Sequence, residues 1–423
     1  MLIQLKYGNS SIPFEYDENQ FQILGKMTQD VALTDVEIGN SFDNPIDSKT
    51  LEEIIQPNET VLFVVPDATR SVASGQIINL LVRRLIANGT MPHEIACIFA
   101  VGIHRPVTED EKQEILTSFI MQRIKTLEHN AKDLAQIIKL GKTKRGTPIE
   151  LNRALTEYDH VILIGGINFH YFAGFTGGRK LICPGLGSTR TISETHKLAF
   201  DFEQKTRREG VGIGLLDGNP VHEEFLEVVQ AINPSFSVNT FVNGKGEATA
   251  VFAGNWKTSH RKACEAYAER QTVEINEKRD VVIVSCGGFP HDINMIQAHK
   301  ALEMASHACN EGGTIIFLAE CADGLGRSDF LNWFEAEDSA GLAEKLCESY
   351  QVNGQTAWSL LKKAERFKIK IVTDLSEIET GKMRLEKTKD FTAAIGQTNK
   401  NSTGYIFPFG AKFMVKQIAA KSA

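Results

Sequence analysis

The chain has 423 residues, which is enough for two domains with substantial hydrophobic cores. Its composition, 42% hydrophobic and 23% charged, is that of an ordinary globular protein, and no apolar run approaches the roughly 20 residues of a transmembrane helix. The formal net charge of −7 argues against nucleic acid or an anionic membrane as the main partner.

The N-terminus and the cysteines both indicate a cytoplasmic protein. Residues 1–8 lack the pattern of a signal peptide and predict a first strand. The seven cysteines are scattered without a Cys-x-x-Cys pair, and most lie in apolar stretches, as Cys97 and Cys286 do. This pattern predicts reduced core thiols rather than disulfides or a zinc cluster.

Strand-like apolar runs alternate with helical patterns from residue 60 onward. Runs at 60–65, 96–101 and 161–164 predict strands. Residues 75–88 place their apolar side chains on one helical face, and Thr108-Glu-Asp-Glu111 is typical of a capping box that opens a helix. This βαβ rhythm predicts a largely parallel, doubly wound sheet.

The C-terminal part of the chain continues the pattern. Residues 254–280 are rich in Ala, Glu, Lys and Arg, and predict a helix leading out of the first domain. Further strands are expected at 281–285, 314–318 and 370–373, and helices at 339–349 and 356–368. We therefore predict two α/β domains with largely parallel sheets, at 1–270 and 271–423.

Each of the three predicted strands in the first domain is followed by candidate functional residues. The segment Asp67-Ala68-Thr69-Arg70 follows the first strand, and His104 follows the second. The third leads into a glycine-rich stretch that contains His170 and Lys180. Because ligands bind outside the carboxyl ends of the strands in open α/β sheets, we expect these loops to meet in space.

The glycine-rich stretch does not match the common nucleotide-binding motifs. The backbone amides of its glycines could hold a phosphate. It is not a P-loop, because Arg179 stands where that motif needs glycine and Leu181 where it needs Ser or Thr. No Gly-x-Gly-x-x-Gly opens a helix after any predicted strand, which argues against an ordinary nicotinamide dehydrogenase.

The segment from His170 to Lys180, followed sixteen residues later by His196, resembles the core motif of the nickel-pincer lactate racemase family. Further segments are similar to other motifs of that family in the same order: residues 67–70, residues 102–105, and Asp292-Ile-Asn294 with Gln297 and Lys300. Each match alone is weak, but together they span most of the chain. The resemblance implies that 1–270 is the cofactor-binding and catalytic domain and that 271–423 closes an interdomain active-site cleft.

The resemblance implies a nickel-pincer nucleotide, which is a Ni(II)-pyridinium-3,5-bisthiocarboxylic acid mononucleotide. By position in the motif, Lys180 would carry this cofactor as a thioamide and His196 would be the nickel ligand. The resemblance also assigns contacts with the cofactor or substrate to Asp67, Ala68, Thr69, Arg70, Gln297 and Lys300. Proteins that synthesise the cofactor are implied as partners.

The resemblance makes His104 and His170 the acid/base pair of a racemase or epimerase acting on a 2-hydroxy acid. Inversion at C2 needs proton transfer at the hydroxyl on either face, and a neutral histidine can take this proton and return it. The C2 hydride would pass to the cofactor and return to the opposite face of a planar 2-keto acid. Arg70 is a candidate for the substrate carboxylate, because guanidinium binds carboxylate through two parallel hydrogen bonds.

Other interpretations remain open. The histidines could be hydrogen-bonded loop residues, Lys180 a solvated lysine, and Asp67 a turn or N-cap residue. Gln297 and Lys300 could lie on a solvated helix face. The rival functions are a sugar or sugar-acid epimerase with the same cofactor, and a cofactor-binding protein without catalysis. The presence of both proposed acid/base histidines favours an enzyme, since carrying the cofactor would require only the lysine and the nickel ligand.

Two positions bear on the substrate. Ile296 stands just before Gln297, where related racemases often have tyrosine. An apolar side chain there would favour a 2-hydroxy acid with a longer or bulkier side chain than lactate, unless Ile296 faces the domain core. Trp358 either lines the C-terminal pocket or belongs to the core.

Overall fold

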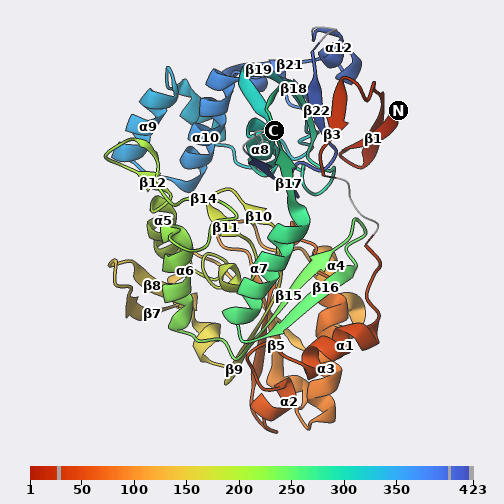
Figure 1. The fold of residues 1–423 in the computed structure, drawn as a ribbon. Helices are drawn as coiled ribbons and strands as arrows, with labels where there is room; N and C mark the ends of the chain where they lie inside the picture. Colours follow the sequence, from red (N-terminus) through yellow and green to blue (C-terminus); the bar gives the residue numbers. More distant parts are fainter. Residues whose placement is uncertain (26–29, 399–401, 419–423) are drawn as a thin grey trace. The chain divides into compact units, whose positions relative to one another are not determined.

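The structure, a computed structural model, describes residues 1–25, 30–398 and 402–418 and divides into two units (Figure 1). The N-terminal unit comprises residues 29–199 and 209–267, and the C-terminal unit comprises residues 1–28, 200–208 and 268–423. Each unit contains a six-stranded sheet with helices. The predicted α/β class with largely parallel sheets is confirmed.

The division differs from the predicted boundaries of 1–270 and 271–423 because the start of the chain belongs to the C-terminal unit. Strand β3 (Phe21–Ile23) pairs in parallel with β22 (Gly404–Phe407) and forms the edge of the C-terminal sheet. The hairpin of β1 (Leu2–Tyr7) and β2 (Ser10–Glu15) packs on the same sheet. The pairing of β3 with β22 joins residues almost a whole chain length apart, so no local sequence pattern predicts it.

The sheet of the N-terminal unit is parallel except for one edge strand. Its order is β16 (Ala248–Gly254), β15 (Phe236–Val242), β9 (His160–Gly166), β4 (Val61–Pro66), β5 (Ile95–Ala100) and β6 (Lys125–Leu127). Only β16 runs antiparallel to its neighbour. The central strand β4 is buried along its whole length, as expected for an apolar strand covered on both faces.

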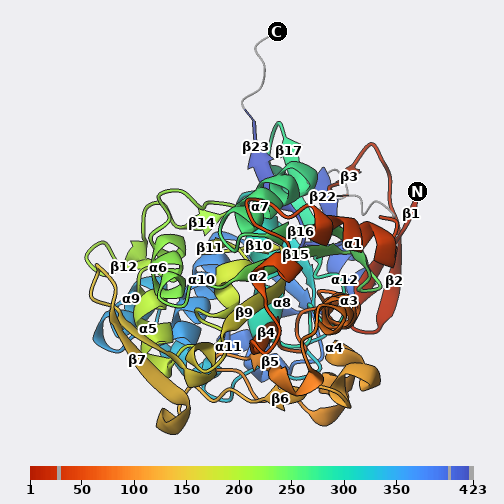
Figure 2. The same cartoon turned by 90° about the horizontal axis from the view of Figure 1, so that it is seen from below.

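Alternate residues of β4 point into two cores. Val61, Phe63 and Val65 pack under helices α1 (Asp35–Asp43), α2 (Leu51–Ile54), α3 (Ser74–Ala87) and α4 (Glu109–Met121). Leu62 and Val64 lie in the core on the opposite face, with α6 (Pro220–Gln230) and the short helix η4 (Gly178–Leu181). In Figures 1 and 2 the first helices lie on one side of this sheet and α5 (Thr189–Lys197) and α6 on the other. The sheet is therefore doubly wound, as predicted.

All strands of the C-terminal sheet are parallel. Their order is β21 (Glu386–Lys387), β20 (Lys368–Val372), β19 (Cys309–Leu318), β18 (Arg279–Ser285), β22 and β3. One face packs on α8 (Met295–Ser306), α9 (Ser339–Glu348) and α10 (Val352–Arg366), and the other on the β1–β2 hairpin and α12 (Phe391–Gly396). None of the described helices is long and apolar enough to span a bilayer.

The helix predicted over 254–280 is wrong at both ends. Helix α7 spans Thr258–Gln271 and is followed by strand β17 (Thr272–Ile275), which pairs with β23 (Met414–Gln417). The composition of the stretch favours a helix, but the β-branched residues Thr272, Val273 and Ile275 suit a strand once a partner is available. The capping box at Thr108 is confirmed as the start of α4.

Candidate active site

Three adjacent strands of the N-terminal unit end in the loops that carry the predicted residues. Asp67 follows β4, His104 follows β5, and His170 lies just beyond β9 in the short strand β10 (Phe169–His170). Because β9, β4 and β5 are neighbours and run in parallel, their carboxyl ends lie at one edge of the sheet. The predicted grouping of these three loops is therefore confirmed.

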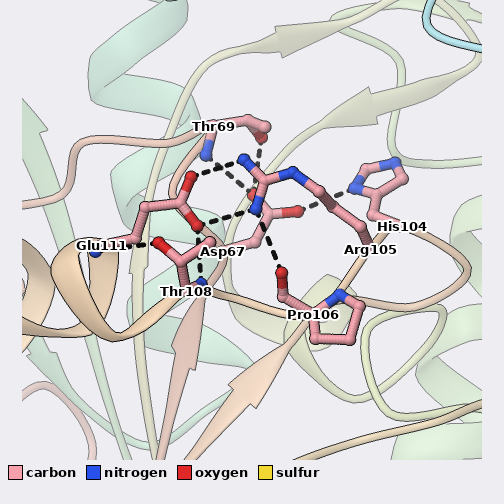
Figure 3. A network of polar contacts seen from close by, with 7 residues as sticks. All are labelled: Asp67, Thr69, His104, Arg105, Pro106, Thr108 and Glu111. Carbon is pink, nitrogen blue, oxygen red and sulfur yellow. Dashed lines mark hydrogen bonds and ion pairs between the residues drawn. The ribbon is translucent and has the colours of Figure 1, made fainter.

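Asp67 and His104 form a hydrogen-bonded pair (Figure 3). Asp67 Oδ2 lies 2.7 Å from His104 Nδ1, and Oδ1 accepts hydrogen bonds from the amide and the hydroxyl of Thr69 at 3.1 and 2.6 Å. Burial raises the pKa of the Asp67 carboxyl, but the hydrogen bond and charge of His104 and the charge of Arg70 outweigh it and hold this pKa well below its ordinary value. The ionised Asp67 therefore orients a histidine whose side chain is 48% exposed.

The Asp67–Arg70 segment is a tight turn that leaves a guanidinium available. The amide of Arg70 donates to the carbonyl of Asp67 at 3.2 Å. Ala68, Thr69 and Arg70 are half-buried, and no carboxylate of the described residues lies within ion-pair distance of the Arg70 side chain. Arg70 can thus receive an anionic ligand.

Arg105, beside His104, is engaged elsewhere. Its guanidinium forms two hydrogen bonds with Glu111, at 2.8 and 2.5 Å, and Glu111 also accepts from the amide of Thr108 in the capping box of α4 (Figure 3). Arg105 therefore fixes the loop to the helix that follows it.

Backbone hydrogen bonds join the His104 loop to the Lys180 loop. The amide of Gly102 donates to the carbonyl of Gly185 at 2.8 Å, and the amide of Gly185 donates to the carbonyl of Lys180 at 3.0 Å. A Cβ atom on Gly185 would lie 2.3 Å from the carbonyl oxygen of Leu181, so only glycine permits this approach. The two loops are consequently held in fixed register.

Phe172 brings the other three predicted residues together. Its ring centroid lies 4.4 Å from that of His170 and 5.1 Å from that of His196, and 5.4 Å from Lys180 Nζ. Phe225 of α6 contacts the same pair, with its centroid 5.6 Å from Lys180 Nζ and 5.8 Å from the His196 ring. The predicted tether and the predicted nickel ligand therefore share two aromatic neighbours. Sequence reasoning missed both rings: Phe172 lies inside the motif, whereas nothing local marks Phe225.

The His196 ring is buried and held neutral. It lies on α5, as predicted, and Nδ1 donates to the carbonyl of Ile192 at 2.7 Å. Burial, together with the charge of Lys180, lowers the pKa of His196 to about 3, against the opposing effect of the Ile192 bond. With Nδ1 holding the proton, the Nε2 lone pair is the one that can bind a metal.

The described residues contain no group of three or more His, Cys, Asp and Glu side chains that could hold a metal ion. His196 therefore offers a metal a single imidazole. A cofactor that carries its own nickel ligands and needs one imidazole fits this donor set. The Lys180 amine lies beside the same two rings.

The predicted residues of the C-terminal unit surround the start of α8. Buried Asp292 accepts from the amide of Gly8 at 2.8 Å through Oδ2, and Asn294 caps the helix by accepting from the amide of Gln297 at 3.0 Å. Lys300 donates to Gln297 Oε1 one turn along α8. Gln297 and Lys300 thus form one polar pair, and their contact with the cofactor remains a prediction.

Ile296 and Trp358 both contact the hydrophobic core of the C-terminal unit. Ile296 is half-buried against this core. Trp358 is buried, and its ring packs edge-on against Phe200 at 5.2 Å. Trp358 therefore belongs to the core, and the effect of Ile296 on the choice of substrate remains a prediction.

Comparison with known proteins assigns the family. The chain is 31% identical over 335 residues to lactate racemase from Lactiplantibacillus plantarum, covering 78% of this chain and 77% of the relative. It is 28% identical to lactate racemase from Thermoanaerobacterium thermosaccharolyticum, covering 98% and 99% of the two chains. The lactate racemase N-terminal domain matches residues 7–207, and the C-terminal domain matches residues 275–405. The chain belongs to the lactate racemase family. By this membership it is an isomerase.

Solved structures have the same fold. The structure of the lactate racemase apoprotein from Thermoanaerobacterium thermosaccharolyticum superposes with a TM-score of 0.87 at 27% identity, covering 98% of this chain and all of that chain. A crystal structure of a protein from Thermotoga maritima has the same fold, with a TM-score of 0.72 at 19% identity over 93% of this chain.

In this member of the lactate racemase family, Arg179 holds the glycine-rich loop from inside. Its side chain is fully buried, and it donates to the carbonyl of Ala173 at 2.7 Å and, more weakly, to that of Thr176 at 3.4 Å. The ring of His260 lies 3.0 Å from Nη1. Burial lowers the pKa of Arg179 to about 10, so the guanidinium stays charged near neutral pH. It is the residue before Lys180 and serves the loop rather than a ligand.

We expect Arg179→Leu to lower the free energy of unfolding by about 2–4 kcal/mol, because it removes the hydrogen bonds that a buried guanidinium donates to the carbonyls of Ala173 and Thr176. Urea denaturation of the full chain measures this loss. Arg190→Leu is the control, since the Arg190 side chain is itself 65% exposed and its contact with Glu150 is long, at 3.4 Å, so this contact should be worth less than about 1 kcal/mol. Equal losses in the two variants would contradict the role given to Arg179.

Proposed function

We propose that this enzyme inverts the C2 centre of a 2-hydroxy acid by proton-coupled hydride transfer, using a nickel-pincer nucleotide bound covalently at Lys180. The observation that carries the proposal is the shared aromatic contact of His170, Lys180 and His196 around Phe172. The names of the two relatives, both lactate racemases, support a hydroxy acid as substrate.

The cofactor, when bound, supplies an acceptor for the C2 hydride and gives it back. The protein supplies attachment and orientation. In this proposal His196 gives Nε2 to the nickel, and Lys180 gives its amine to the thioamide. Further contacts with the cofactor come from Asp67, Ala68, Thr69, Gln297 and Lys300.

The remaining side chains act on the substrate. Arg70 binds the carboxylate through paired hydrogen bonds, which sets the position of C2. His104 and His170 exchange the hydroxyl proton from the two sides, because each stands on its own strand-end loop. Phe172 and Phe225 keep water away from the reacting centre.

The half-buried guanidinium of Arg70 also indicates which of the candidate substrates the enzyme prefers. Its charge helps to lower the pKa of Asp67, but none of the described carboxylates forms an ion pair with it, so it favours an acid over a neutral sugar. The alternative of a non-catalytic carrier is disfavoured by the Asp67–His104 pair, because carrying the cofactor needs no oriented base. An epimerase acting on a sugar acid stays compatible with the same residues.

The proposal is tested by producing the full chain in a host that makes the cofactor and in one that does not. We expect a mass gain on the peptide containing Lys180, nickel near one per chain, and interconversion of 2-hydroxy acid enantiomers only in the first case. An unmodified, nickel-free protein that is nevertheless active would refute the proposal.

We propose a cytoplasmic location, with the proteins that synthesise the cofactor as partners. All seven cysteines are free and six of them are buried, which suits a reducing compartment.

Arg70→Lys tests the substrate class. We expect the Michaelis constant for 2-hydroxy acids to rise at least about tenfold, since lysine keeps the charge but loses the paired donors. Steady-state kinetics with the cofactor-loaded variant measure this change. If the best substrate is a neutral sugar and the variant binds it with unchanged affinity, the substrate class is a sugar and not a 2-hydroxy acid.

A further inference from the structure

The two proposed acid/base histidines have different kinds of hydrogen-bond partner at Nδ1: an acceptor at one and donors at the other. His104 Nδ1 faces the carboxylate of Asp67, whereas His170 Nδ1 faces backbone amides of residues 172 and 173. An ionised carboxylate can only accept hydrogen bonds, and an amide N–H can only donate them. We infer that the protein holds the two rings in opposite tautomers, with Asp67 as the positioning residue for His104.

At His104 the proton is on Nδ1. The Asp67 carboxyl is buried, 2.7 Å away, and its other oxygen is occupied by the two hydrogen bonds from Thr69. Asp67 therefore cannot rotate to another arrangement without losing three contacts. The consequence is that Nε2 of His104 carries the lone pair and can act as a base.

At His170 the proton is on Nε2. The amides of Ala173 and Phe172 point at Nδ1 from 3.3 and 3.5 Å, so Nδ1 must be an acceptor. The hairpin of β10 with β11 (Ala173–Phe175) fixes these amides through the pairing of His170 with Gly174. Arg179 holds the carbonyl of Ala173 from the inside. Nε2–H of the neutral ring is then a hydrogen-bond donor.

The two tautomers give the rings different roles in the reaction. This consequence rests on the proposed function. From the side of His104, the substrate O–H bond breaks and an N–H bond forms at Nε2, giving an imidazolium that Asp67 stabilises. On the other side, the neutral His170 gives the substrate oxygen a hydrogen bond from Nε2–H and keeps this proton, because its loss would leave an imidazolate. The proton taken up by His104 returns to the oxygen when the hydride returns to C2. To act as a base it must first move this proton to Nδ1 and give up both amide contacts. The resting protein is thus ready for the reaction that begins at His104.

Nuclear magnetic resonance of the full chain, labelled with ¹⁵N only at histidine Nδ1, tests the inference at mildly alkaline pH. Two histidines of the same unit serve as internal standards. His196 donates from Nδ1 to Ile192, whereas His129 accepts at Nδ1 from Asn152 and faces the Gly187 carbonyl with Nε2. Single His→Gln variants assign the signals.

We expect a protonated Nδ1 for His104, as for His196, and an unprotonated Nδ1 for His170, as for His129. The same state in His104 and His170 would overturn the inference. Because the measurement uses protein without cofactor or substrate, an inactive enzyme with the expected ring states would count against the proposed function alone.

Asp67→Asn gives a second readout. An amide can donate to Nδ1, so we expect the His104 signal to lose its fixed protonated state while the His170 signal stays unchanged. Turnover of the loaded variant should fall about a hundred- to ten-thousandfold, as for other histidines that lose an orienting carboxylate. Glu111→Gln makes the same chemical change in the neighbouring Arg105 pair and should leave the His104 signal in place. A fixed Nδ1 proton on His104 in Asp67→Asn would refute the role of Asp67.

Discussion

Replacing Lys180 by alanine is expected to abolish both covalent attachment of the cofactor and turnover. The side chain contacts the same two aromatic rings as His196, and its charge contributes to the lowered pKa of that histidine. Without the amine no thioamide can form, and one imidazole cannot retain the nickel alone. Intact mass, nickel content and enantiomer interconversion measure the three losses.

Two control variants make this result specific. Lys197→Ala removes a nearby lysine that pairs with Glu194 on the surface of α5, and it should keep the adduct and the rate. Lys180→Arg keeps the charge but not the nucleophilic amine, so it should behave like the alanine variant. Full turnover in Lys180→Ala would show that the attachment point lies elsewhere.

The sequence predicted the edge of the sheet at which the site forms, because the decisive features are local. Apolar runs followed by polar loops marked β4, β5 and β9, and the rule for parallel strands placed Asp67, His104 and His170 at one edge. The helix that carries His196 was predicted for the same reason. Local sequence is enough to predict both a strand and the loop that follows it.

The remaining features depend on contacts between residues far apart in the sequence, which no local pattern predicts. Strand β3 reaches β22 across nearly the whole chain, so the first residues could not be assigned to the C-terminal unit. Strand β17 forms because β23 is present. Phe225 contacts Lys180 from another helix. Asp67 was expected to hold the cofactor or brace its loop, and only the 2.7 Å contact reveals its pairing with His104.

The site combines a rigid frame with an exposed base. Arg179, the Gly102–Gly185 bond and the two phenylalanines fix the loops, whereas the His104 side chain remains 48% exposed. A base that must reach substrate has to stay accessible, and its orientation then depends on a buried partner. This explains why Asp67 is buried while the ring it holds is not.

His104→Ala and His170→Ala are each expected to lower racemisation at least about a hundredfold, the usual scale for a lost acid/base group. Each variant should keep the adduct at Lys180 and the nickel, because neither ring is a metal ligand in the proposed site. Initial rates from each pure enantiomer, followed by chiral chromatography on loaded enzyme, measure the loss. The double variant should lose little more than the worse single variant, since the two rings serve one reaction. His93→Ala, which changes a histidine outside the site, should retain the full rate. If both single variants interconvert the enantiomers at nearly the unaltered rate, the histidine pair is not the acid/base machinery.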